Sequence, residues 1–301
     1  MLSERLALYT TVYPGVERYL AAWYRSVLMQ TDRRFDLWIG SDGLSPEAVA
    51  EAVGATPDAS WVYGGAGESG GRVRAHAIEL MADVYDGIVF VDSDDLLEPS
   101  RVSAARAALR ECDVAGCALR IVDEAARDTG AVFGLDAPDD LGTILPRHNV
   151  LGLSNTAYRS AVLRRCLPVP PACELLDWLL GTRAWASGAR LGFDPVPRMR
   201  YRQYAQNVAQ VLPPFSETYV LRATERVLGH YDCLKSKDWP LPEAPHRAID
   251  DAHQRARAFH DAIFASAVLR ERYVAALNAL PPHGVWWWCV ANPELECIWR
   301  N

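Results

Sequence analysis

Three aspartates in four positions follow an apolar run in the stretch IVFVDSDDLLEP, residues 88–99. Asp92, Asp94 and Asp95 would repel one another, since two carboxylates about 4 Å apart cost roughly 4 kcal/mol at an effective dielectric near 20. A divalent cation would offset this repulsion, whereas a turn that caps the next helix needs only one aspartate. Oxygen ligands alone favour Mg²⁺ or Mn²⁺, which keep waters and bind substrate phosphates. The stretch therefore predicts a Mg²⁺ or Mn²⁺ site.

Other polar residues lie where predicted strands end. Strands are expected from apolar runs at 5–13, 35–43, 60–65 and 88–92. Helices are expected from apolar spacing and end signals at 18–30, 45–54, 70–87 and 99–112. This alternation is typical of an α/β fold with a mostly parallel sheet and helices on both faces, and such sheets bind ligands at the carboxyl ends of their strands. Thr10, Thr11 and Asp42 lie at those ends, with the three aspartates.

After residue 122 the regular alternation of predicted strands and helices ends. Between 123 and 210 the pattern is mixed, with a helix around 174–188 and two short strands within 189–204. Helical patterns follow at 217–234 and, as one long amphipathic run, at about 246–280. We therefore expect one α/β domain over 1–210 and a helical C-terminal extension over 211–301.

The stretch VWWWCV, residues 285–290, stands out in this extension. Trp286, Trp287 and Trp288 could lie at a membrane interface, where indoles are favoured, but few basic residues adjoin them. Packing of this stretch back onto the core or onto a partner is the favoured interpretation. The extension is also a candidate surface for homo-oligomer formation.

Composition excludes several classes of protein. The chain has 301 residues, half of them hydrophobic, and a net charge of -7, which gives no electrostatic basis for binding nucleic acid. Its seven cysteines are scattered and predict neither a disulfide framework nor a zinc site. The first residues lack the apolar core of a signal peptide, and no apolar run approaches the roughly 18 residues of a membrane span. A cytoplasmic location is expected, with peripheral membrane contact as an alternative.

Ordered blocks between residues 6 and 208 resemble the inverting GT-A glycosyltransferases of family 2. The opening block, residues 6–43, has a strand, a helix ending in Ser26, Gln30 and Thr31, and a strand leading to an acidic turn. The second block, GGRVRAHAIELMADVYDGIVFVDSDD, is similar to the stretch of that family that leads into its metal-binding aspartates. The last block, LLDWLLGTRAWASGARLGFDPVPRMRYRQYAQNV, resembles the helix that carries the family's catalytic aspartate and the strands after it.

This resemblance implies a GT-A fold, a nucleotide-diphospho sugar as donor, with UDP favoured, and transfer with inversion. Asp42 would then contact the base of the nucleotide, with Thr10 or Thr11 in the same pocket, and Arg74 would approach the nucleotide. Asp92 and Asp94 would contact ribose and metal. Asp94 and Asp95 are the expected metal-ligand pair.

The resemblance also assigns the acceptor side. Asp177 would be the general base that takes the proton of an acceptor hydroxyl. Trp178 could stack on a sugar, although a position in the core is the favoured interpretation, and Glu174 and Arg202 are further candidates for substrate contacts. The acceptor itself is open: a glycan, a lipid-linked molecule or a small molecule.

Two departures from the family pattern leave an alternative. Leu176 replaces a glutamate that usually precedes the base, and Tyr204 stands where a histidine is expected. A catalytically silent scaffold that binds nucleotide or a partner protein is therefore the second hypothesis. A nucleotidyltransferase is disfavoured, because the glycine-rich stretch GGAGESGG, residues 64–71, comes only after the third predicted strand.

Overall fold

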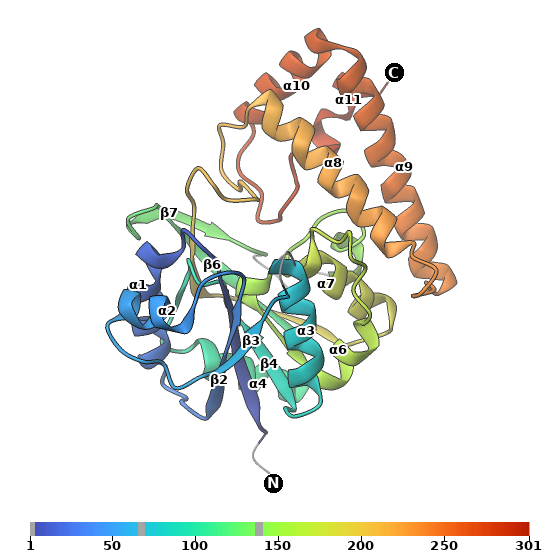
Figure 1. Cartoon of the computed structure of the whole chain (residues 1–301). Helices are drawn as coiled ribbons and strands as arrows, with labels where there is room; N and C mark the ends of the chain where they lie inside the picture. The colour runs from blue at the N-terminus through green and yellow to red at the C-terminus, as the bar shows by residue number, and fades with distance from the viewer. Residues whose placement is uncertain (1–3, 66–69, 136–140, 301) are drawn as a thin grey trace.

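The computed structural model describes residues 4–65, 70–135 and 141–300, so residues 66–69 of the glycine-rich stretch lie outside it. Figure 1 shows a sheet flanked by helices, with a group of C-terminal helices to one side of it. The strands are β1 (Leu6–Val12), β2 (Phe35–Ser41), β3 (Ser60–Tyr63), β4 (Gly87–Phe90), β5 (Leu96–Leu97), β6 (Val114–Val122), β7 (Asp128–Phe133), β8 (Thr156–Arg159) and β9 (Leu191–Arg202). They form one sheet in the order β3-β2-β1-β4-β8-β6-β9-β5, with β7 paired to β6.

Helices alternate with the first strands as expected. The helices up to β9 are α1 (Glu17–Leu28), α2 (Pro46–Val53), α3 (Gly70–Ala82), α4 (Arg101–Glu111), α5 (Leu141–Ile144), α6 (Ser160–Cys166) and α7 (Leu176–Ala186). A side chain added at Gly40 would meet Val73 of α3, whereas one added at Gly87 would meet Leu109 of α4. Helices α3 and α4 therefore cover opposite faces, and the prediction of an α/β fold is confirmed.

The sheet is more mixed than the sequence predicts. Strands β3, β2, β1 and β4 are parallel, but β8 runs antiparallel to both β4 and β6, and β5 runs antiparallel to β9. The expected pair of short strands at 189–204 is one strand, β9, whose pairing with β6 jumps from Asp194 to Met199. Pro195 and Pro197 lie in that jump, and proline cannot donate to a ladder. The prolines explain why the pattern resembles two strands.

The C-terminal region is helical, as predicted, and its first helix packs against α7, where His230 stacks on Trp178. It contains α8 (Glu217–Leu234), α9 (Glu243–Ala265), α10 (Ala267–Ala279) and α11 (Glu296–Trp299). The single run expected at 246–280 is two helices, because Ser266 ends α9 and its side chain caps α10 by accepting from the Leu269 N–H. The domain boundary at residue 210 stays a prediction. No helix in the described ranges is both long and apolar enough to span a bilayer.

The tryptophan stretch lies against the body of the protein. The ring of Trp286 packs on Phe133 of β7, with centroids 4.4 Å apart, and meets Tyr201 of β9 edge to face at 5.9 Å. Trp286, Trp287 and Trp288 are all buried. This confirms the expectation that the stretch packs back onto the core.

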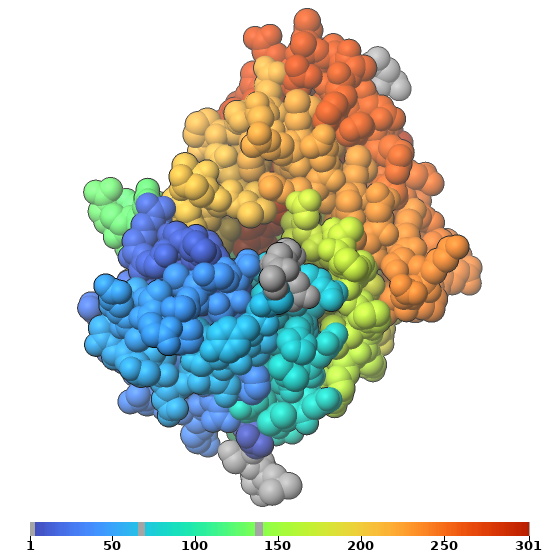
Figure 2. Space-filling model, viewed as in Figure 1, coloured from blue at the N-terminus to red at the C-terminus, as the bar shows by residue number. Residues whose placement is uncertain are grey.

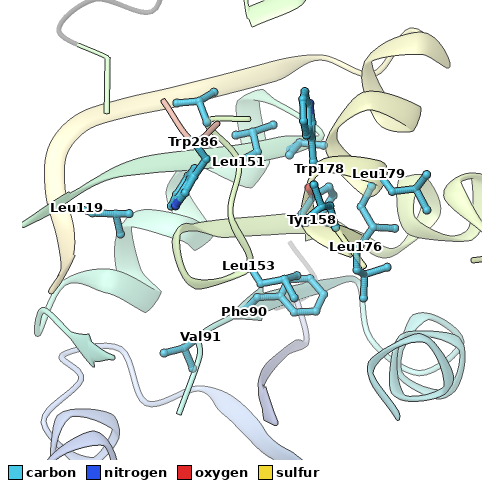
Figure 3. Packing of buried hydrophobic residues seen from close by; sticks show 14 of the residues in the cluster. Phe90, Val91, Leu119, Leu151, Leu153, Tyr158, Leu176, Trp178, Leu179 and Trp286 are labelled. Atoms are coloured by element: carbon cyan, nitrogen blue, oxygen red, sulfur yellow. The ribbon is translucent and has the colours of Figure 1, made fainter. Parts of the chain in front are cut away.

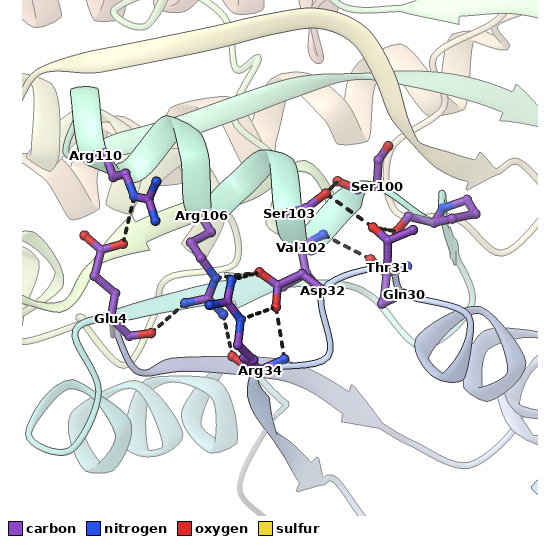
Figure 4. Close-up of polar contacts among 11 residues, drawn as sticks. Glu4, Gln30, Thr31, Asp32, Arg34, Ser100, Val102, Ser103, Arg106 and Arg110 are labelled. Carbon is purple, nitrogen blue, oxygen red and sulfur yellow. Dashed lines mark hydrogen bonds and ion pairs between the residues drawn. The ribbon is translucent and has the colours of Figure 1, made fainter. Parts of the chain in front are cut away.

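A buried arginine ties the start of the sheet together (Figure 4). Arg106 of α4 donates from Nε to Asp32 Oδ2 at 2.7 Å and from Nη1 to the Glu4 carbonyl at 2.6 Å. Hydrogen bonds from Arg34 and from Arg106 hold the pKa of Asp32 well below its usual range, although burial opposes them. A depressed carboxylate pKa stabilises the fold above the unfolded value of about 3.9, and that contribution is lost as the pH falls below it. Arg106 therefore fixes the entries to β1 and β2 at neutral pH.

Replacing Arg106 tests this arrangement. Arg106→Met should lower the free energy of unfolding by about 3–5 kcal/mol, because it leaves the Asp32 carboxylate buried with less compensation. Arg110→Met is the matched control on the same helix. The Arg110 side chain is 63% exposed and its nitrogen lies 3.9 Å from Glu4, so its loss should cost under about 1 kcal/mol. Urea unfolding of both variants at pH 7 measures the difference, and equal midpoints would contradict the account.

Candidate active site

The carboxyl ends of the central strands open into a cavity of about 760 Å³. Figure 2 shows the surface hollowed between the blue N-terminal part and the gold and orange C-terminal helices. Most of the polar residues expected to act together line this cavity: Thr11, Asp42, Arg74, Asp92, Asp94, Glu174 and Asp177. The fold therefore gathers side chains that are up to 166 positions apart in the chain, from Thr11 to Asp177.

The three aspartates of the acidic stretch have different partners. Asp95 is 1% exposed and does not line the cavity. Its Oδ1 accepts from the Arg202 backbone N–H at 2.8 Å, and its Oδ2 accepts from the Ser154 hydroxyl. Burial first, then the charges of Asp94 and Asp92, raises the pKa of Asp95 well above its usual value. Asp95 therefore holds the end of β4 to β9 and is poorly placed for the metal-ligand role predicted for it.

Asp92 and Asp94 remain at the cavity. Asp92 Oδ1 accepts from Arg74 Nη2 at 3.0 Å, and Asp94 Oδ2 accepts from the Tyr204 hydroxyl at 2.7 Å. The Tyr204 hydroxyl also lies 3.4 Å from that of Tyr13. Tyrosine at position 204 thus gives the carboxylate of Asp94 a neutral donor.

The carboxylate oxygens of Asp92 and Asp94 are suitable ligands for a divalent cation. Burial, and then the negative charge of Asp92, raises the pKa of Asp94, so ionised Asp94 lacks full compensation. A nearby cation would supply that compensation. Among the described residues no group of three or more His, Cys, Asp or Glu side chains is arranged to hold a metal. A metal at Asp92 and Asp94 would therefore need further ligands from water and substrate, as is usual for Mg²⁺ and Mn²⁺.

A second part of the cavity suits a nucleotide. Asp42 follows β2 and lies against the start of α3, where a side chain added at Gly70 would come within 2.8 Å of Asp42 Oδ2. Glycine therefore permits this close approach. Arg74, one turn into α3, donates from Nε to Thr11 Oγ1 at 3.1 Å. Asp42, Thr11 and Arg74 form a polar wall at the N-terminus of a helix, which favours anions.

Thr10 does not share this wall. Successive side chains of a strand point to opposite faces. Tyr9 and Thr11 lie on the α3 face of β1, since the Thr11 hydroxyl donates to the Tyr9 hydroxyl at 3.0 Å and Tyr9 lies under Gly40. Thr10 points to the other face and is fully buried. Of the two threonines predicted for the pocket, the structure brings only Thr11 to it.

Asp177 lies in the first turn of α7 and faces the same cavity. Its Oδ2 accepts from Asn149 Nδ2 at 2.9 Å. Burial raises the pKa of Asp177 to about 6, and the charge of Asp92 adds to the rise, while the Trp178 N–H and Arg74 oppose it. A carboxyl group with this pKa is ionised at neutral pH and is a stronger base than an ordinary aspartate.

Trp178 is a core residue. It is 0% exposed, its ring stacks on His230 of α8 with centroids 4.0 Å apart, and its Nε1 donates to the Leu145 carbonyl at 2.8 Å. Figure 3 shows Trp178 among buried apolar side chains that include Leu176 and Leu179. Of the two interpretations of Trp178, the structure supports the core position, because no face of this ring is open to a sugar.

Of the two further candidates for substrate contacts, Glu174 lines the cavity and Arg202 does not. Glu174 lines the cavity and forms an ion pair with Arg226 of α8 at 3.1 Å. Arg202 is buried away from the cavity lining, where it donates from Nε to the Asp94 carbonyl at 2.7 Å and lies over the Tyr19 ring. Arg202 thus supports the acidic turn from behind, and a substrate contact is not available to it in this structure.

Sequence reasoning missed the segment that links these groups. Ser154 accepts from the Asp92 N–H at 3.0 Å and donates to Asp95, and Asn149 donates to Asp177. Trp286 and Trp287 line the same cavity. The stretch HNVLGLSN, residues 148–155, places polar residues within an apolar run, but no periodicity shows where their side chains point.

Solved structures share this arrangement of elements. Residues 1–349 of TarS from S. aureus superpose with a TM-score of 0.57 at 16% identity, over 91% of this chain and 78% of that chain. The same protein in complex with UDP-GlcNAc gives 0.58 at 17% identity, over 90% and 78%. The mannosyltransferase PcManGT from Pyrobaculum calidifontis, in complex with GDP-Man and Mn2+, gives 0.56 at 15% identity, over 92% and 77%.

The fold is that of the GT-A glycosyltransferases. No family profile and no curated protein sequence matches the chain. The expected GT-A fold with a helical C-terminal region is confirmed, while membership of family 2 stays a prediction.

Alanine variants separate the two roles in the acidic stretch. Asp95→Ala should lower the free energy of unfolding by about 1–3 kcal/mol, because the buried Ser154 hydroxyl and Arg202 N–H lose their acceptor. Asp94→Ala should leave the stability of the metal-free protein unchanged or raise it, since it removes a carboxylate that Asp92 repels. Thermal unfolding in EDTA at pH 8 measures both, and a larger loss for Asp94→Ala would contradict the assignment.

Proposed function

We propose that this protein is a metal-dependent glycosyltransferase that moves a sugar from a nucleoside-diphospho sugar to an acceptor hydroxyl with inversion. The observation that carries the proposal is the meeting of Asp92 and Asp94 with Asp177 in one cavity, beside Asp42 and Arg74. The fold adds support, since TarS has been captured with UDP-GlcNAc and PcManGT with GDP-Man and Mn2+. UDP remains the favoured nucleotide, and GDP is the first alternative to test.

The donor would occupy the part of the cavity near the strand ends. Asp42 and Thr11 would contact the nucleoside, and Arg74 would approach its phosphates. Asp92 and Asp94 would hold Mn²⁺ or Mg²⁺. Such a cation, when bound, neutralises the charge that develops on the diphosphate as the bond to the sugar breaks.

The acceptor would approach from the side of Asp177. An uncharged hydroxyl is a poor nucleophile at neutral pH, so a carboxylate within hydrogen-bond reach assists by taking its proton. The acceptor oxygen forms a bond to the anomeric carbon, the bond from that carbon to the diphosphate oxygen breaks, and the proton moves to Asp177. Attack from the face opposite the diphosphate inverts the anomeric centre.

The neighbourhood of Asp177 provides for these steps. Glu174, just before α7, and Arg226 of α8 line the cavity, as does Trp287, and all three would contact the acceptor. A glycan, a lipid-linked molecule and a small molecule all remain candidate acceptors. A cytoplasmic location, peripheral membrane contact and assembly through the C-terminal region likewise stay predictions.

A silent scaffold is the second candidate, and one observation favours it. The Tyr204 hydroxyl occupies Asp94 Oδ2, an oxygen that a metal would otherwise use. Release of nucleoside diphosphate from UDP-GlcNAc or GDP-Man, measured with Mn²⁺ and with EDTA, separates the two. Metal-dependent release supports an enzyme, whereas nucleotide binding without release at any metal concentration supports the scaffold.

The roles of the two cavity carboxylates near α7 can be distinguished by amide variants. Asp177→Asn keeps the size of the side chain but cannot accept the proton, so turnover should fall by roughly 10² to 10⁴ while donor affinity stays near that of the wild type. Glu174→Gln is the matched control and should keep turnover within about tenfold. Steady-state kinetics and donor titration measure the two quantities. Full transfer by Asp177→Asn, or its loss in Glu174→Gln, would overturn the assignment of the base.

The pH dependence of turnover provides an independent test. The pKa of Asp177 is raised to about 6 in the folded protein, and only its ionised form can accept a proton. Turnover at saturating donor should therefore be constant above pH 7 and fall about tenfold per pH unit well below pH 6. A profile without a limb between pH 5 and 7 would contradict the role of Asp177.

A further inference from the structure

Asn149 connects the proposed base to the protein core. It is 0% exposed. Its Oδ1 accepts from the Leu151 backbone N–H at 2.9 Å, and its Nδ2 donates to Asp177 Oδ2 at 2.9 Å. Because a backbone N–H can bond only to the amide oxygen, the orientation of the Asn149 amide is fixed, and its NH₂ group must face Asp177.

The C-terminal region holds Asn149 in place. The Asn149 carbonyl accepts from the Trp286 N–H at 2.7 Å, which forms an isolated bridge between the two segments. Three residues on, a side chain added at Gly152 would come within 2.8 Å of the Trp286 ring, so the ring lies directly on this backbone. Figure 3 shows Trp286 beside Leu151 of this segment. The segment between residues 149 and 152 is therefore clamped from the C-terminal side.

We propose that Asn149 is a positioning residue for sugar transfer: its amide orients the Asp177 carboxylate, and the C-terminal segment at Trp286 holds that amide in place. The inference rests on the proposed function and extends it, because it gives the C-terminal region a part in catalysis. Truncating this region would remove the clamp on Asn149 while leaving Asp177 itself in the chain.

The amide also affects the protonation of the base. A donated N–H stabilises the ionised carboxylate more than the neutral acid, so it lowers the pKa against the rise that burial causes. The other groups whose charge acts on Asp177 are Arg74 of α3 and Asp92 after β4, with Tyr158 of β8 and Cys173 before α7 close enough to sense it. Among the described residues, the Asn149 side chain is hydrogen-bonded to Asp177 and the Leu151 N–H and to none of these four groups.

Carboxyl titration of Asp177 by NMR tests the inference without any need for activity. For this experiment the protein is produced with ¹³C-labelled aspartate. The signal that disappears in Asp177→Asn is assigned to the Asp177 carboxyl. Asn149→Ala should raise the pKa of Asp177 by about one unit, because a hydrogen bond to a charged group is lost. Asn149→Asp, nearly identical in shape, should raise it further, because two carboxyl groups then face each other.

Asn155→Ala is the matched control. Asn155 is 1% exposed and lies on the same segment, but its Nδ2 donates to the Cys117 and Val150 carbonyls. Its replacement should disturb packing to a similar extent and leave the Asp177 titration unchanged. If the alanine variants do not fold, the comparison of wild type with Asn149→Asp still decides the matter.

The pH profile of transfer then separates positioning from a general loss of structure. In the Asn149 variants the acid limb should move upward with the NMR titration, whereas a structural defect would lower turnover equally at every pH. An unshifted Asp177 titration in both Asn149 variants overturns the inference. A shifted titration in a protein that transfers no sugar from any nucleotide donor upholds the contact and refutes the proposed function instead.

Discussion

The structure depends on placing three neighbouring carboxylates so that each has its own hydrogen-bond donor to offset their mutual repulsion. Asp92, Asp94 and Asp95 occupy four consecutive positions with Ser93 shortly after β4, and the burial of Asp94 and Asp95 keeps water from screening their charges. The fold assigns each a different partner: Arg74, the Tyr204 hydroxyl, and the Ser154 hydroxyl with the Arg202 N–H. To deliver these partners, α3, the 149–154 segment and β9 must all converge on the end of β4.

These partners do not fully compensate the negative charge at the cavity surface. Asp95 is satisfied inside the protein, whereas Asp94 keeps a raised pKa at the cavity surface. Across the cavity, burial raises the pKa of Asp177, and the charge of Asp92 adds to the rise. Asp92, which with Asp94 would hold a cation, therefore also contributes to the proton affinity of Asp177. The C-terminal region completes the cavity wall, because Trp286 and Trp287 line the cavity and Trp286 also holds the segment that carries Asn149.

Much of this could be predicted from the sequence, because strand ends in parallel sheets converge. Asp42, Asp92 and Asp94 were expected together on this ground, whereas Asp177, on a helix, was added by the resemblance to GT-A glycosyltransferases. The structure brings all four to one cavity. The fate of Asp95 could not be predicted, since its partners Ser154 and Arg202 are 59 and 107 positions away. The choice between core and sugar contact for Trp178 could not be settled for the same reason: His230, which covers its ring, belongs to a helix whose packing no local pattern reveals. Strand β6 was missed because both its faces are covered, which removes the alternation that marks a half-exposed strand.

The central claim is that the cavity binds a nucleoside diphosphate through a cation held by the acidic pair. Calorimetric titration of UDP and GDP into the protein, with Mn²⁺ and with EDTA, tests it most directly. Because the described residues supply too few ligands for a metal alone, Mn²⁺ without nucleotide should bind weakly. With Mn²⁺ present, one nucleotide should bind at least about tenfold more tightly than in EDTA, a gain of about 1.4 kcal/mol. Equal affinities with Mn²⁺ and with EDTA, or no binding of either nucleotide, would contradict the account.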